Sequence, residues 1–318
     1  MRGDGSMIDF SCKHDRWIRN DDGTLSRMDE PYFKSWKLAE GTWRVLSSGD
    51  YSYLIEGDDE ALAIDSGYGA GNIREYMQSL TAKPLSRIAN THDHFDHTAM
   101  NSYFDMAYMS EATRELATRP FPSFAGIDFP RDYPVTILKD GDTVPLKGRD
   151  LTAILIPDHA VGSMAFLDRK MRILFSGDEF MGPRKMLSRG LTSWLHSLER
   201  LAAVRSEFDI MYGGAFTVEA DVVDRMLTCT KMALETGGEP MKGGPGGPGG
   251  PGGHGPHGPG GPHGGPGNEQ DAEGRIIYDR MMPHPEDKGK PHFSSPDNLR
   301  RQEYEGTEVI FDITKIHE

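Results

Sequence analysis

Three histidines and two aspartates stand within six consecutive positions of this chain, in the run Thr91-His92-Asp93-His94-Phe95-Asp96-His97-Thr98. An apolar stretch that ends at Ala89 predicts a short strand just upstream, so the run begins where a strand gives way to a loop. In an extended segment His92 and His94 point to the same side, whereas the last two ligands of the run fall past a turn. This spacing favours two adjacent metal ions over one, and zinc binds imidazole together with carboxylate.

Two later segments supply the ligands that such a metal centre still needs. An apolar, strand-like run at 152–156 leads into His159, and a second one at 172–176 leads into Gly177 and Asp178. Each of these two side chains follows a predicted strand, at the point where a loop begins. In open sheets, catalytic and binding residues lie on such loops. The predicted ligands are His92, His94 and His159 for one ion, Asp96 and His97 for the other, and Asp178 as a bridge between the two.

The spacing of these ligands resembles that of the metallo-β-lactamase-fold superfamily, whose pattern is H-x-H-x-D-H, a later His in P-x-H-x-x-G-S, and then G-D. The predicted paired strands at 51–56 and 61–65 are similar to the opening β-hairpin of that family. The resemblance covers the chain from the region of Trp43 to that of Ala215. It implies an α/β fold, a four-layer αβ/βα sandwich with a binuclear metal site in the cleft between its two sheets. The motifs identify the fold better than the substrate, since one fold hosts many chemistries.

One position departs from the family pattern. The family usually supplies a last His in a G-H-G-like turn after a further strand, and here the strand predicted at 208–212 leads into Gly213-Gly214-Ala215-Phe216. Ala215 has no donor atom, so the second metal site lacks a protein ligand. Three explanations stay open: an engineered His→Ala change, a natural site that holds its second metal weakly, or a shifted alignment in which another histidine such as His196 or His284 reaches in.

The resemblance also implies two divalent metal ions, with zinc as the first expectation and manganese or iron as alternatives. Such ions acidify a water to hydroxide, which can attack the carbonyl of a small ester, lactone, thioester or amide. Asp96 would then be catalytic, because it would orient the nucleophile or protonate the leaving group. The alternatives are an iron-dependent redox member of the fold, similar to the persulfide dioxygenases or the diiron proteins, and a non-catalytic metal-binding sensor.

Five further side chains are weaker candidates. Asp65 and Asp93 could hold a ligand imidazole in place, although an aspartate in a turn as often caps the local backbone. Tyr68, Tyr212 and His196 could contact the substrate, and Tyr212 is the best placed because it directly precedes the predicted glycine turn. Core packing is the alternative for all three.

Composition narrows the classes of partner. The formal net charge is −14 over 318 residues and no basic run is present, which argues against nucleic acid and anionic membranes as partners. No apolar run approaches the roughly 18 residues of a membrane span, and the polar segment 1–7 lacks the apolar core of a signal peptide. Cys12 and Cys229 form no C-x-x-C motif, so the sequence indicates neither a disulfide framework nor a thiolate metal site. We therefore expect a cytoplasmic enzyme with a small-molecule substrate, and association into a homo-oligomer stays open.

The sequence divides into four parts. They are an N-terminal extension at 1–40, a metallo-β-lactamase-like domain at 41–236, a flexible Gly/Pro/His-rich insertion at 237–267, and returning strands with a lid at 268–318. Helices are predicted near 71–80, 110–118, 191–205 and 218–234. An aromatic-rich loop at 120–134 could line a pocket mouth or pack in the core. The histidines of the insertion could scavenge metal ions, although a simple spacer is the favoured interpretation.

Overall fold

The chain folds into two compact units. The computed structural model describes residues 16–19, 23–27, 33–47, 50–67, 71–117, 131–241, 269–279 and 295–318. The first unit comprises Met1–Leu138, Thr143–Leu151 and Gly264–Lys288, and the second comprises Lys139–Asp142, Thr152–His263 and Gly289–Glu318. Of the predicted metal ligands, those of the run 92–97 belong to the first unit, whereas His159 and Asp178 belong to the second. The four-part domain division stays a prediction.

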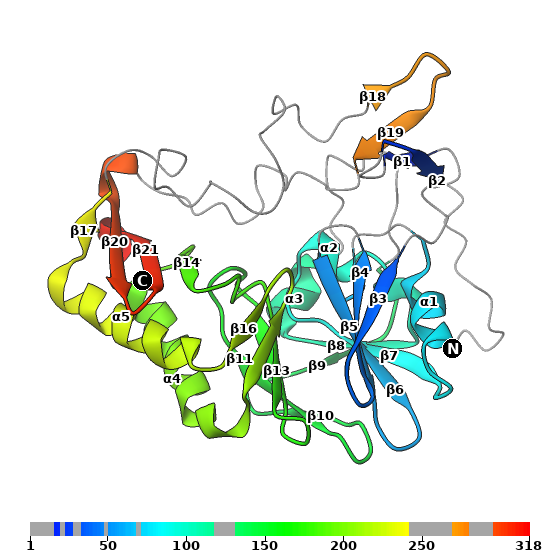
Figure 1. The fold of residues 1–318 in the computed structure, drawn as a ribbon, viewed down its shortest axis with the longest axis horizontal. Coiled ribbons are helices and arrows are strands. Elements are labelled where there is room, and N and C mark those ends of the chain that lie inside the picture. The colour runs from blue at the N-terminus through cyan, green and yellow to red at the C-terminus, as the bar shows by residue number, and fades with distance from the viewer. Residues whose placement is uncertain are drawn as a thin grey trace. The chain divides into compact units, whose positions relative to one another are not determined.

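A seven-stranded sheet forms the centre of the first unit, in the order β3-β4-β5-β6-β7-β8-β9 (Figure 1). Its strands are β3 (Lys34–Ala39), β4 (Thr42–Ser47), β5 (Asp50–Glu56), β6 (Ala61–Ile64), β7 (Leu85–Ala89), β8 (Met106–Met109) and β9 (Val135–Ile137). Neighbours from β3 to β6 pair antiparallel, which confirms the predicted opening hairpin, and neighbours from β6 to β9 pair parallel. Parallel neighbours need long crossovers, and these carry α1 (Ile73–Ser79), α2 (Phe95–Thr98) and α3 (Glu111–Leu116).

Two helices of the first unit begin at residues that cap them. The side chains of Asn72 and Ser110 each accept a 3.1 Å hydrogen bond from a backbone amide in the first turn of α1 and α3, respectively. Such caps satisfy amides that have no partner within the helix. Ile73 and Met77 of α1 are fully buried in the core of this unit. The helices predicted near 71–80 and 110–118 are thereby confirmed.

A four-stranded sheet of the first unit joins distant parts of the sequence, in the order β18-β19-β1-β2. Its strands are β1 (Arg16–Arg19), β2 (Leu25–Arg27), β18 (Glu269–Gln270) and β19 (Ile276–Asp279). β1 runs parallel to β19 and antiparallel to β2. β19 is thereby one of the returning strands predicted within 268–318.

The second unit contains two sheets and two long helices (Figure 1). One sheet has the order β10-β11-β12-β13-β15-β16, and its strands from β12 onward lie wholly in this unit. The strands are β10 (Thr143–Val144), β11 (Leu151–Leu155), β12 (Met164–Asp168), β13 (Ile173–Gly177), β15 (Ile210–Gly213) and β16 (Thr217–Glu219). The other sheet has the order β14-β21-β20-β17, with β14 (Arg184–Met186), β17 (Glu239–Pro240), β20 (Leu299–Tyr304) and β21 (Thr307–Asp312).

The helices α4 (Leu191–Ala203) and α5 (Val222–Thr236) complete the second unit. α5 packs against α4 and against the β20–β21 hairpin, and the shared core includes Trp194, Met226 and Phe311. The chain leaves α5 at Gly237, whose φ of +75° favours glycine. β17 then pairs with β20, and the Met241 amide donates to the Leu299 carbonyl at 3.2 Å.

The helix predicted near 191–205 is confirmed as α4, but the one predicted from residue 218 is wrong over its first residues. Thr217–Glu219 forms β16, in which Val218 pairs with Met211, and the helix starts only at Val222. The apolar residues before 222 therefore extend the sheet. Most of the aromatic loop, the insertion and the lid lie outside the described residues.

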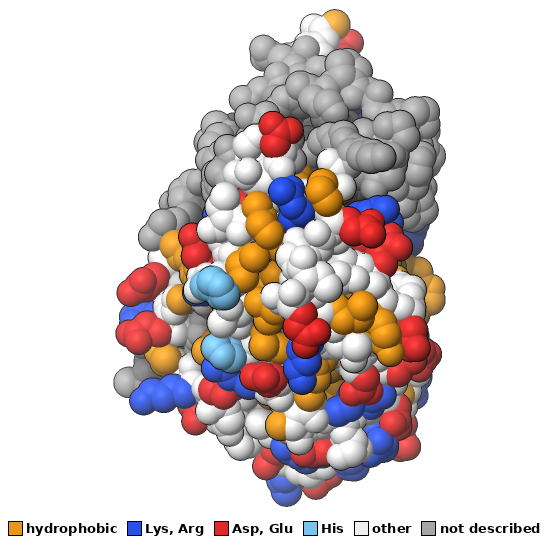
Figure 2. Space-filling model, turned by 90° about the vertical axis from the view of Figure 1, so that its left-hand side faces the viewer, with side chains coloured by type: hydrophobic (Ala, Val, Ile, Leu, Met, Phe, Trp, Pro, Cys, Tyr) orange, Lys and Arg blue, Asp and Glu red, His pale blue; other side chains and the backbone are white. Residues whose placement is uncertain are grey.

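Two findings bear on surface partners. No helix among the described residues is long and apolar enough to cross a membrane. On the face shown in Figure 2, acidic and basic side chains are intermingled and form no continuous basic surface. The expectation that nucleic acid is not a partner stays a prediction.

Cys229 is fully buried on α5, and its thiol donates a hydrogen bond to the Gln302 carbonyl at 3.1 Å. Burial raises the pKa of this thiol to about 11. In a Cys12→Ser variant we therefore expect the remaining thiol to resist a thiol reagent at about pH 8 until the protein is unfolded in guanidinium, because the thiolate is the reactive form. Equal reaction rates for the folded and unfolded variant would contradict this burial.

Candidate metal centre

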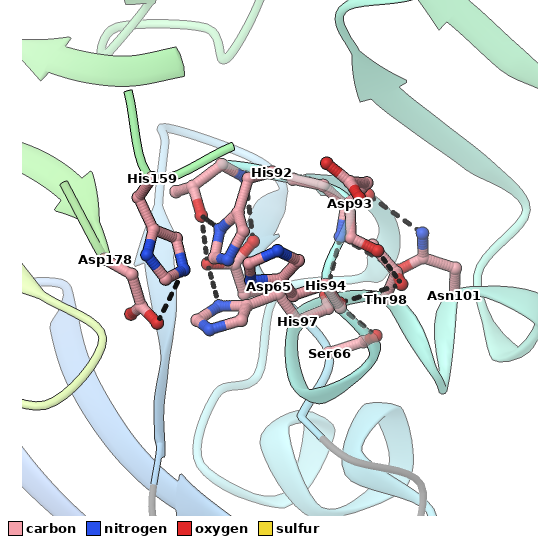
Figure 3. Close-up of polar contacts among 12 residues, drawn as sticks. Asp65, Ser66, His92, Asp93, His94, His97, Thr98, Asn101, His159 and Asp178 are labelled. Carbon is pink, nitrogen blue, oxygen red and sulfur yellow. Dashed lines mark hydrogen bonds and ion pairs between the residues drawn. The ribbon is translucent and has the colours of Figure 1, made fainter. Parts of the chain in front are cut away.

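A single buried carboxylate organises the histidine cluster of the first unit. Asp65 directly follows β6 with a left-handed φ of +58°, and it is 2% exposed. Its Oδ1 accepts a hydrogen bond from the Thr91 amide at 2.8 Å, and its Oδ2 accepts from Thr91 Oγ1 at 2.7 Å and from His97 Nδ1 at 2.9 Å (Figure 3). Three donors therefore converge on one side chain: two belong to Thr91, which directly precedes His92, and one belongs to His97.

These hydrogen bonds fix the orientation of two imidazoles. Because a carboxylate only accepts, the proton of the His97 ring lies on Nδ1. Thr91 gives its single hydroxyl proton to Asp65, so the same oxygen accepts from His92 Nδ1 at 3.0 Å. When these rings are neutral, the lone pair of each is therefore on Nε2. A metal-binding histidine is usually held in this way, by a carboxylate or carbonyl on its other ring nitrogen.

The short helix α2 is held by its own buried polar contacts. The His97 carbonyl accepts hydrogen bonds from the Ser66 amide at 2.8 Å, from Ser66 Oγ at 3.2 Å and from Asn90 Nδ2 at 2.8 Å. Asn90 and Asn101 then exchange two amide hydrogen bonds of 2.9 and 3.0 Å. The loop after β6 and the loop after β7 thus anchor the helix that carries two of the predicted ligands.

The ligand side chains of the first unit gather closely. The His92 ring centroid lies 4.5 Å from that of His94 and 4.1 Å from that of His97. Asp96 is 7% exposed, and it joins His97 and Asp50 in a group whose donor atoms all lie within 4.8 Å of one another. Asp50 opens β5 and was not predicted as a ligand. Imidazole and carboxylate donors at such distances fit a divalent metal.

The second unit holds the other two predicted ligands. His159 Nε2 lies 3.5 Å from Asp178 Oδ2, and the Asp178 side chain is 1% exposed (Figure 3). Asp178 follows β13 at Gly177, whose φ of +53° permits the sharp exit from the strand. The amide of Gly214 donates to the Gly177 carbonyl at 3.0 Å, so the turn that carries Ala215 adjoins the Asp178 turn. The strand predicted before the glycine turn is confirmed as β15, and the role of position 215 in a metal site stays a prediction.

A buried ion group next to these ligands was missed by sequence reasoning. Lys185 Nζ lies 2.7 Å from Glu179 Oε2 and 3.0 Å from Asp158 Oδ2, with all three side chains buried. Glu179 Oε1 also accepts the backbone amides of Asp158 at 3.1 Å and of His159 at 2.8 Å. Glu179 therefore shapes the loop that carries His159. The one signal in the sequence was the position of Glu179 directly after Asp178.

The charge state of this group follows from its partners. Burial alone would raise the pKa of the Glu179 carboxyl, but the charges of Lys185 and His159, with hydrogen bonds from Lys185 and Ser163, hold that pKa below its usual value. Lys185 also lies 4.6 Å from the centroid of the Trp194 ring. The ammonium is thus surrounded by two carboxylates and an aromatic face.

The weaker candidates fall in different places. Tyr212 is 8% exposed and its ring lies 6.0 Å from that of Phe175, whereas His196 is exposed on α4. The Asp93 carbonyl accepts the Thr98 hydroxyl at 3.2 Å. Tyr68 and His284 lie outside the described residues. Roles for these side chains in the site stay predictions.

The fold and the ligand run define a class of protein. The family model of the metallo-beta-lactamase superfamily matches residues 49–208, half of the chain, and the chain belongs to this superfamily. The predicted fold class, an α/β sandwich of the metallo-β-lactamase type, is thereby confirmed. A sec-alkylsulfatase, Pisa1 from Pseudomonas sp., has a similar fold with a TM-score of 0.52, at 14% identity over 69% of this chain and 49% of that one.

Curated relatives have several activities in their names. Acyl-coenzyme A thioesterase MBLAC2 of Gallus gallus is 31% identical over 166 residues, which cover 42% of this chain and 60% of the relative. The alpha subunit of 2,4-dinitroanisole O-demethylase of Nocardioides sp. is 29% identical over 64% of this chain and 63% of its own length. Atrochrysone carboxyl ACP thioesterase of Aspergillus fumigatus is 25% identical over 60% of this chain and 43% of its own length. The chain thus spans less than two thirds of each of these relatives.

Proposed function

We propose that this chain is a metal-dependent hydrolase of small acyl compounds, with thioesters as the first substrate class. The observation that carries the proposal is the Asp65 carboxylate, which orients His92 and His97 as ligand imidazoles. The thioesterase names of two relatives support the choice of a thioester over an ester, lactone or amide.

The chain's own residues take three roles in this proposal. The ligands are His92, His94 and His159 for one cation, and Asp96, His97 and Asp178 for a second. When bound, such cations would acidify a water and polarise the substrate carbonyl. Asp96 would take the proton released by that water at one carboxylate oxygen and deliver it to the thiolate leaving group. Asp65 and Thr91 would keep the two imidazoles in their ligand orientation throughout.

Exposed apolar side chains of the second unit support an apolar acyl group. Val161, Met181 and Phe216 are 54, 39 and 40% exposed, and each stands within three residues of His159, Asp178 or position 215. Their loops adjoin, because His159 contacts Asp178 and because the Gly214 amide donates to the Gly177 carbonyl. Large exposed apolar side chains around a site are typical of ligand contact. We refer to these three residues as the apolar rim.

A panel of acyl-coenzyme A thioesters of increasing chain length tests the proposal. We expect hydrolysis by the zinc-loaded protein, loss of hydrolysis after dialysis against a chelator, and recovery on adding zinc or manganese. Longer acyl chains should give a higher kcat/KM, and Phe216→Ser should reduce this gain while Trp36→Ser, at an equally exposed position of the first unit, should not. Iron as the dominant metal, with no hydrolysis of any acyl substrate, would favour the redox alternative instead.

A further inference from the structure

We infer that Asp50 is a metal ligand of this chain, which joins Asp96 and His97 around the second cation. The inference rests on the proposed metal centre and adds a residue to it. The family pattern expects an imidazole at position 215, where this chain has alanine, so the second cation lacks one protein ligand. Asp50 supplies a carboxylate from a different part of the chain.

The geometry within the first unit carries this inference. One donor atom each of Asp50, Asp96 and His97 lies within 4.8 Å of the other two, which is the spacing of ligands that share an ion at about 2.0–2.2 Å from each. Asp50 is the first residue of β5, where it pairs with Ser47 across the β4–β5 hairpin. α2, which carries the other two residues, contacts β5. Strand and helix therefore hold the three side chains together.

The surroundings of the group point to a cation. A divalent cation bound by both carboxylates would offset their mutual repulsion at this distance. The His97 ring donates through Nδ1 to Asp65. In the neutral ring its Nε2 then carries the lone pair that a metal ion requires. The Asp65 contact lies outside the three-residue group and independently orients the His97 ring as a metal ligand.

Zinc titration of the metal-free full-length chain tests this inference, with bound zinc measured by elemental analysis after dialysis and affinity measured by competition with a chromophoric chelator. We compare the wild type with Asp50→Asn and with a matched control, Asp59→Asn, whose carboxylate is exposed and pairs with Lys147. The expected result is that Asp50→Asn loses about one equivalent of zinc or binds it at least about tenfold more weakly. Asp59→Asn should match the wild type.

Three outcomes would overturn the inference. The first is an Asp50→Asn variant that keeps the stoichiometry and affinity of the wild type; the proposed hydrolase would then still stand. The second is an equal loss in Asp59→Asn, which would reveal an effect of net charge. The third is a wild type that binds no zinc, manganese or iron, and this result would remove the proposed function as well.

Folding of the variant is checked separately from metal binding. Asp50 is half-buried at the end of a strand, so metal-free Asp50→Asn should unfold at the same temperature as the metal-free wild type. Added zinc should raise the unfolding temperature less for Asp50→Asn than for the wild type, because a ligand stabilises the folded state in proportion to its affinity. Equal zinc-induced shifts in both proteins would overturn the inference by a route that does not depend on activity.

Discussion

Replacing Lys185 by methionine should lower the free energy of unfolding by about 3–5 kcal/mol, the cost of leaving buried carboxylates without their countercharge. The Lys185 ammonium contacts Glu179 at 2.7 Å and Asp158 at 3.0 Å, and both carboxylates are almost fully buried. Methionine fills a similar volume but supplies no charge. Denaturant unfolding followed by circular dichroism measures the effect.

An exposed ion pair of the second unit offers a matched control. Arg172 pairs with Asp209, and both side chains are exposed, so Arg172→Met should change the free energy of unfolding far less than Lys185→Met. Lys185→Arg keeps a positive charge, so it should lower the free energy of unfolding less than Lys185→Met. Similar losses for Lys185→Met and Arg172→Met would mean that the buried ion group does not stabilise the second unit as argued.

The contribution of Lys185 also depends on pH. Burial alone would lower the pKa of Lys185, but the Glu179 and Asp158 carboxylates hold it above its usual value of 10.5. A lysine whose pKa is raised on folding stabilises the protein fully below the usual value, and this stabilisation is lost as the pH rises through the folded-state value. The stability difference between the wild type and Lys185→Met should therefore be constant near neutral pH. It should shrink in strong alkali as Lys185 loses its proton, and in acid as Glu179, whose pKa is lowered, gains one.

Asp65→Asn should weaken zinc binding by about 10–100-fold, the effect usual for the partner of a ligand imidazole. The asparagine is isosteric, but its amide nitrogen places a donor where Thr91 and His97 both need an acceptor. The ring of His97 would then lose the contact that sets its tautomer. Competition with a chelator of known affinity measures the change.

Ser66→Ala separates this effect from a general loss of structure. Ser66 Oγ donates to the His97 carbonyl and accepts from the Met100 amide, so its removal loosens α2 without touching any imidazole. It should cost about 1 kcal/mol of unfolding free energy and leave the zinc affinity close to that of the wild type. If Asp65→Asn bound zinc as tightly as Ser66→Ala, the orienting role of Asp65 would be wrong.

The sequence predicted the strands that precede the candidate ligands. The run 91–98 follows β7, and His159 and Asp178 follow β11 and β13. These strands were predictable because each signal lies within a few residues, whereas the metal-binding roles stay predictions. Asp65 was a candidate for holding a ligand imidazole. In the sequence, an aspartate in a turn looks the same whether it caps the local backbone or hydrogen-bonds to a histidine ring. Only the position of His97 Nδ1 at 2.9 Å distinguishes the two roles.

The parts that escaped prediction depend on contacts across the sheet. Asp50 is the first residue of β5 and looks like a turn residue in the sequence. Its approach to Asp96 depends on how α2 packs on β5. Lys185 stands in a short polar run, yet it is 7% exposed. Strands as short as β9 and β16 carry too few residues for a periodic pattern. In each case the deciding contact joins residues that are distant in sequence.

The pairing of β17 with β20 has a consequence for the evolution of this chain. Met241 and Leu299 are joined by a backbone hydrogen bond, so the connection between them begins and ends at the same place on the second unit. Lengthening a connection whose ends are already fixed costs little, because the entropy of closure grows only with the logarithm of length. Insertions and deletions in this connection, which also contains β18 and β19, can therefore accumulate between relatives without any change in the register of β17 with β20.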